Sequence, residues 1–114
     1  MKFYDEARMS GIRRTLEDEI LHWPGVTSRE MMGCLCYFHG KSFFAFLVTQ
    51  GIVITKLPPN ERATVVTQLK AEPFTMAGRS VKTWVKVPLE EPKRVSQILP
   101  FVKKSYQTVS NRRA

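Results

Sequence analysis

The sequence predicts an α+β fold in two layers, with one antiparallel sheet of about four to five strands flanked by helices. The first observation is that residues 31–57 form three apolar runs, joined by short turns that contain Gly40 and Gly51. Turns of this length make neighbouring strands antiparallel. The second is that the segments on either side have helical spacing of apolar residues. The predicted order is helix, three strands, helix, strand, helix.

A first helix is predicted between Asp5 and His22. Apolar residues recur every four positions along it, at Ile12, Leu16 and Ile20, which is the spacing of one helix face. Met9 and Leu21 are expected to flank this stripe. The outer face is expected to carry the acidic residues Glu17, Asp18 and Glu19. The Trp23-Pro24-Gly25 sequence ends the helix, and residues 26–30 are expected to lead into the sheet.

The three strands are apolar on both faces, which is unusual for a sheet with one wet side. Alternation along an extended strand places Phe44, Phe46 and Val48 on one face, and Phe43, Ala45 and Leu47 on the other. A second apolar face needs a cover, which helices, a partner subunit or a ligand would provide. The candidate interaction face therefore consists of Phe43, Phe44 and Phe46.

The remaining elements are shorter. A helix is expected from Asn60, as its N-cap, to Ala71, with Val65, Val66 and Leu69 buried. Residues 73–80 are expected to form a loop. A strand is expected over residues 81–87, with Lys82, Trp84 and Lys86 on one face and valines and a threonine on the other.

The C-terminal segment has helical spacing but contains Pro100. Proline inside a helix removes a hydrogen bond, so we expect a short helix over residues 92–98 and a second one with Pro100 in its first turn. Residues 110–114 are expected to be a disordered tail.

Length and composition indicate one soluble domain spanning residues 1–114. No apolar run approaches the roughly 20 residues of a membrane helix, and no signal peptide is apparent at the N-terminus, so we expect a cytoplasmic protein that does not bind membranes. The net charge of +8 is uneven: residues 1–78 carry nine basic and eight acidic side chains, and residues 79–114 carry nine and two. The basic C-terminal third favours anionic partners or is simply a solvated surface.

No catalytic or metal site is predicted, and no cofactor is expected. Cys34, Cys36 and His39 lie within six residues, but a structural zinc needs four ligands, and these cysteines are expected in a strand as a reduced, buried pair. A cysteine nucleophile would need an exposed thiolate beside a base. No phosphate-binding glycine loop is present.

A basic and aromatic surface is a further candidate. It comprises Lys56, Arg79, Lys82, Trp84 and Lys86, and aromatic rings between lysines are suited to single-stranded nucleic acid. The structural alternative is that Trp84 is buried beneath a helix, with the lysine stems extending past it.

Several motifs resemble the TfoX N-terminal domain family. They are Met31-Met32-Gly33, the Gly40 turn with the aromatic strand after it, Ile52-Val53-Ile54-Thr55-Lys56, Pro73-Phe74, Gly78-Arg79 and Trp84-Val85-Lys86-Val87-Pro88. The resemblance covers roughly residues 10–108, although Met32-Gly33 stands where the family usually has Met-Phe-Gly. It implies a secretion-chaperone-like fold that often dimerises, and no catalytic residues. The leading expectation is a non-catalytic regulatory or protein-interaction module with itself or another protein as partner; the alternative is weak, sequence-independent nucleic-acid binding through the basic C-terminal third.

Overall fold

The computed structural model describes residues 4–31, 33–76 and 78–110, and for Met76, Ser80 and Lys82 it describes the backbone alone. The described helices are α1 (Glu6–Ile20), α2 (Pro59–Leu69) and α3 (Val95–Ser110), with a 3₁₀ turn, η1 (Pro92–Arg94), before α3. The described strands are β1 (Val26–Met31), β2 (Cys34–His39), β3 (Ser42–Val48), β4 (Gly51–Ile54), β5 (Glu72–Met76) and β6 (Arg79–Pro88).

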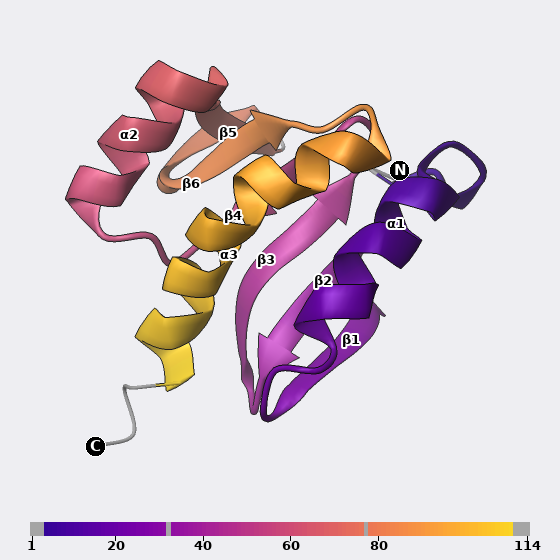
Figure 1. Ribbon diagram of the computed structural model, residues 1–114. Helices are drawn as coiled ribbons and strands as arrows, with labels where there is room; N and C mark the ends of the chain where they lie inside the picture. Colours follow the sequence, from indigo (N-terminus) through magenta and orange to yellow (C-terminus); the bar gives the residue numbers. More distant parts are fainter. Residues whose placement is uncertain (1–3, 32, 77, 111–114) are drawn as a thin grey trace.

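All six strands join one antiparallel sheet in the order β1-β2-β3-β4-β6-β5. The α+β class and the helices on the sheet are confirmed, and the expected strand count is slightly low. Figure 1 shows α1 and α3 crossing the front of the sheet and α2 beside the β5–β6 hairpin. No helix among the described residues is long and apolar enough to cross a membrane.

Two strands were not predicted: residues 26–30 were expected only to lead into the sheet, and residues 73–80 were expected to form a loop. Residues 26–31 form β1, which pairs with β2 over its whole length, and residues 72–76 form β5, which pairs with β6. Residues 73–80 were predicted as a loop because proline is unfavourable inside a sheet. Pro73 is tolerated because β5 is an edge strand, and the pairing shifts register between Pro73 and Phe74.

The helix-side core lies between the sheet and the three helices. Its buried members include Met9, Ile12, Leu16 and Ile20 from α1, Val65 from α2, and Val95, Ile98, Val102, Tyr106 and Val109 from α3. The predicted α1 stripe is confirmed, with Asp5 as N-cap, but Leu21 is 40% exposed. Glu17 is not on a solvated face, because its Oε2 accepts a hydrogen bond from the Tyr37 hydroxyl at 2.8 Å.

A β-bulge in β3 changes the predicted faces of the sheet. Tyr37 pairs with Ala45 and Phe38 pairs with Phe43, so Phe44 is an extra residue between the two pairs. Phe44 therefore turns into the helix-side core with Ala45 and Leu47, while Phe43 moves to the opposite face with Phe46 and Val48. The strict alternation predicted from the sequence therefore placed Phe43 and Phe44 on the wrong faces of the sheet.

The second face of the sheet holds another cluster, which we call the concave-face cluster. Its buried members are Cys34, Cys36, Phe38, Phe46, Val48, Val53 and Phe74, with Met31, Phe43 and Trp84 partly buried against them. The Phe46 and Phe74 rings have centroids 5.4 Å apart, although β4 and β6 lie between β3 and β5 in the sheet. Strands are spaced about 4.8 Å apart, so this contact requires the sheet to curve around the cluster. The curved sheet itself covers most of its second apolar face.

The two remaining helices differ from prediction in detail. α2 begins one residue before Asn60, with Pro58 as N-cap, and its Val66 is 47% exposed. α3 is continuous through Pro100 and includes Ser110, so the predicted break at Pro100 is wrong. Pro100 itself is exposed. Residues 111–114 of the expected tail lie outside the described residues.

Candidate functional site

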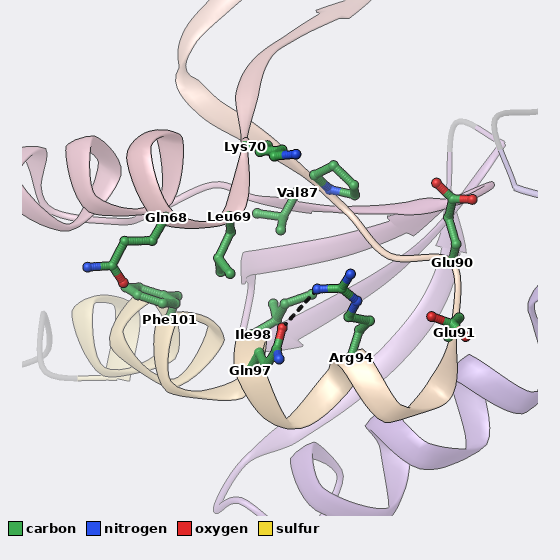
Figure 2. Close-up of a pocket in the computed structure, with 11 residues that line it drawn as sticks. Gln68, Leu69, Lys70, Val87, Glu90, Glu91, Arg94, Gln97, Ile98 and Phe101 are labelled. Atoms are coloured by element: carbon green, nitrogen blue, oxygen red, sulfur yellow. Dashed lines mark hydrogen bonds between the residues drawn. The ribbon is translucent and has the colours of Figure 1, made fainter.

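A groove lies between the C-terminal end of α2 and the first half of α3, and is here called the α2–α3 groove (Figure 2). Its volume is about 880 Å³, within the roughly 300–1,000 Å³ typical of ligand pockets. The lining residues are Gln68, Leu69, Lys70, Val87, Pro88, Glu90, Glu91, Arg94, Gln97, Ile98 and Phe101. None was predicted from the sequence as a site residue, because the groove brings residues 68–70 together with residues 87–101.

The groove has an apolar floor and a charged rim. Val87 and Ile98 are buried, and Leu69 and Phe101 are partly buried against the helix-side core. In Figure 2 the Arg94 guanidinium lies on the α3 side of the groove, and it donates a hydrogen bond to Gln97 Oε1, one turn further along, at 3.2 Å.

The charged rim groups are largely free to meet a partner. Over the described parts of the chain, Lys70, Glu90 and Arg94 form no ion pair. Glu91 pairs with Lys93 at 3.8 Å, but both side chains are more than half exposed, and exposed pairs of this kind are weak. The lining includes no thiol, hydroxyl side chain or imidazole. An apolar floor with a charged rim is suited to binding an amphipathic surface.

The cysteines lie where the sequence placed them, side by side on one face of β2. Both are buried, in the concave-face cluster, and neither is in a disulfide. Burial raises the pKa of Cys34 to about 12 and that of Cys36 to about 11. His39 lies on the other face, where its ring meets Tyr106 with centroids 5.8 Å apart. No group of three metal-ligating side chains occurs within residues 4–31, 33–76 and 78–110.

The structure brings together some residues of the candidate basic and aromatic surface. β6 pairs with β4, so Trp84 and Lys86 do lie next to the strand that precedes Lys56. Trp84 is not under a helix: it belongs to the concave-face cluster, with its ring 5.5 Å from those of Phe43 and Phe46. Lys56 Nζ lies 5.4 Å from the Phe43 ring centroid. Arg79 is exposed at the start of β6, and the side chain of Lys82 lies outside the described residues.

The candidate interaction face is divided by the bulge. Phe46 is 1% exposed in the concave-face cluster, and Phe43 is partly exposed at its margin. Phe44 is fully buried on the helix side, against Trp23 and Tyr106. Of the three residues, Phe43 alone has appreciable surface in this structure.

Ser105 is an important residue that sequence reasoning missed. This fully buried serine donates from its hydroxyl to the Phe44 carbonyl at 2.6 Å and accepts from the Lys56 amide at 3.0 Å. It thereby ties α3 to the bulge and to the segment after β4. A small polar residue on the buried stripe of α3 was the available signal.

In the comparison with known families, the model of the TfoX N-terminal domain matches residues 18–109. The match covers most of the chain, including the sheet, α2 and nearly all of α3. No curated protein and no solved structure matches the chain.

Proposed function

The chain belongs to the TfoX N-terminal domain family, and we propose that it is a non-catalytic regulatory or protein-interaction module that works in the cytoplasm. The observation that carries this proposal is the α2–α3 groove, which combines an apolar floor with rim charges that have no strong partner. Protein interfaces combine an apolar centre and a polar rim in the same way. The raised pKa values of the two buried thiols argue against cysteine chemistry.

Site-specific photo-crosslinking tests this role. A photoreactive residue in place of Gln97, on the groove, is expected to give a covalent adduct of one defined mass in cells that express the chain at its native level. The matched control is the same substitution at Thr15, which is exposed on α1. Phe101→Glu in the groove floor should abolish the Gln97 adduct. Absence of an adduct at Gln97, or an equal adduct at Thr15, would contradict a groove-mediated interaction.

The partner is either another protein or a second copy of the chain, and light scattering separates the two. A mass of twice 13.1 kDa at high micromolar concentration supports a homodimer. A monomeric mass over the same range excludes self-association and leaves a different protein as partner.

The second candidate function is weak, sequence-independent nucleic-acid binding through residues 79–114. The exposed basic residues of η1 and α3 favour it: Lys93, Arg94, Lys103 and Lys104. Anisotropy of labelled DNA and RNA oligonucleotides checks it, because phosphate binding must weaken steeply as salt concentration rises. No anisotropy change at low salt would exclude this function.

A further inference from the structure

The two edges of the sheet differ in how well they could accept another strand. β5 contains Pro73, and its pairing with β6 shifts register at that point; both features disfavour the pairing of a further strand at this edge. β1 has six residues, no proline and an unbroken register with β2. Its four central residues are all exposed, and no described strand pairs with its outer side. β1 is therefore the edge of the sheet that can accept another strand.

The backbone of β1 presents hydrogen-bonding groups outward at known positions. The Val26 amide donates to the Trp23 carbonyl at 3.2 Å rather than to β2. In an antiparallel ladder the amides alternate between the neighbouring strand and the outside. The Ser28 and Glu30 amides consequently point away from β2, toward the position of an added strand.

The surface beside this edge is basic. A hollow of about 410 Å³ is lined by Thr27, Ser28, Arg29, Phe38, Gly40 and Lys41, with no acidic residue among them. The Arg29 guanidinium lies 5.0 Å from the Phe38 ring centroid and donates a weak bond to Met31 Sδ at 3.9 Å. In the described chain it has no carboxylate partner. A carboxylate over Arg29 and near Lys41 would complete this site.

We propose that the outer edge of β1 accepts an extended segment of a partner protein, with an acidic side chain of that segment over Arg29. Backbone pairing with Ser28 and Glu30 would supply the affinity, and the hollow beside Arg29 would select the acidic residue. The proposal rests on the interaction role proposed above but uses a different surface from the α2–α3 groove.

A second copy of the chain fits this edge poorly. In a twofold pairing of β1 with itself centred on Arg29, the two arginines lie opposite each other, and like charges in that position are destabilising. A pairing centred on Ser28 places Thr27 opposite Arg29. Neither register brings a carboxylate to the guanidinium.

The probe that tests the proposal is a blocked synthetic peptide of alternating Val and Thr around one central Glu; the control peptide has Lys in place of Glu. NMR of the full chain is expected to show shifts and slowed hydrogen exchange at the Ser28 and Glu30 amides, with the Lys peptide binding at least about tenfold more weakly. Arg29→Glu should reverse the preference between the two peptides. Ser28→Pro should abolish binding of both while leaving the spectrum of the sheet intact, because the amide it removes makes no bond to β2.

Three results would overturn the inference. The first is the absence of amide changes at high peptide concentration. The second is that the Glu peptide binds the Arg29→Glu variant as tightly as it binds the unchanged chain. The third is that the amide changes at Ser28 depend on protein concentration alone, which would assign the edge to a second copy. Peptide failure combined with intact Gln97 crosslinking would contradict the edge site alone and leave the groove-mediated function standing.

Discussion

At the scale of single residues, Ser105 shows how one buried hydroxyl holds several segments together. It bonds the carbonyl of the bulged residue Phe44 and accepts from the Lys56 amide, and these groups lie 61 and 49 residues away in the chain. Removing it leaves the Lys56 amide without this partner, whereas the Phe44 carbonyl still accepts a hydrogen bond from the Thr55 amide at 3.2 Å.

Ser105→Ala is therefore expected to lower the free energy of unfolding by about 1–3 kcal/mol, the cost of one backbone amide left unsatisfied. The matched control is Ser96→Ala on the exposed side of the same helix, where the change should stay within about 0.5 kcal/mol. Urea denaturation measures both. Equal effects at the two positions would show that the Ser105 hydroxyl has no special role.

The two thiols allow a second test at this scale. Because burial raises the pKa of Cys34 to about 12 and of Cys36 to about 11, neither is a thiolate in the folded protein at neutral pH. We expect a chromogenic disulfide reagent near pH 8 to react with both only as fast as the protein opens, whereas an unfolded thiol with a pKa of about 8.5 reacts at once. Fast reaction under native conditions would contradict the buried placement.

At the scale of elements, the proline in α3 is expected to cost stability. Pro100 is exposed inside a continuous helix and cannot donate the hydrogen bond of that position. Pro100→Ala is expected to raise the free energy of unfolding by about 1–3 kcal/mol, the helix-propensity gain less the entropy that proline removes from the unfolded chain. Thermal and urea denaturation measure it, and a loss of stability would mean that a bend at Pro100 is needed for packing.

Element prediction succeeded where one local rule dominated and failed where tertiary context decided. The α1 stripe follows from spacing alone and is observed. The alternation predicted for β6 is observed over Trp84, Val85 and Val87, but a register shift with β5 interrupts it between Val81 and Val85. The bulge at Phe44 could not be predicted, because it depends on pairing with β2 and on the Ser105 bond from α3. β5 was missed because Pro73 is acceptable at an edge, and edges become known only with the sheet order. The α2–α3 groove was missed for the same reason, since its lining comes from distant segments.

At the scale of the whole molecule, the curved sheet separates two cores, so residues far from any helix are still deeply buried. Phe46→Ala is expected to lower the free energy of unfolding by about 3–5 kcal/mol, as for other large core truncations. Val66→Ala, at an exposed site on α2, is the control and should change it by less than about 0.5 kcal/mol. A small effect at Phe46 would mean that the concave face is open in solution.

The same burial sets the response of the whole fold to pH. Both thiols keep their protons in the folded state to higher pH than in the unfolded state, so stability is full below the unfolded pKa of about 8.5 and falls as pH rises above it. In urea denaturation, the free energy of unfolding of a Cys34→Ala, Cys36→Ala double variant should decline less steeply between neutral and alkaline pH.

At acid pH the dependence is opposite, and stability falls as pH decreases. Hydrogen bonds from Tyr4 and Arg13 lower the pKa of Glu6, and the contribution of Glu6 is lost as pH falls through that lowered value.

The placement of the two tryptophans gives the protein a built-in pair of fluorescent reporters. Trp23 belongs to the helix-side core and Trp84 to the concave-face cluster, and the chain contains no other tryptophan. Trp23→Phe and Trp84→Phe variants would each leave one emission signal, from one side of the sheet. Coincident denaturation curves from the two would show that both layers melt as a single unit, and an earlier transition from Trp84 would show that the sheet uncurls while its helices are still docked.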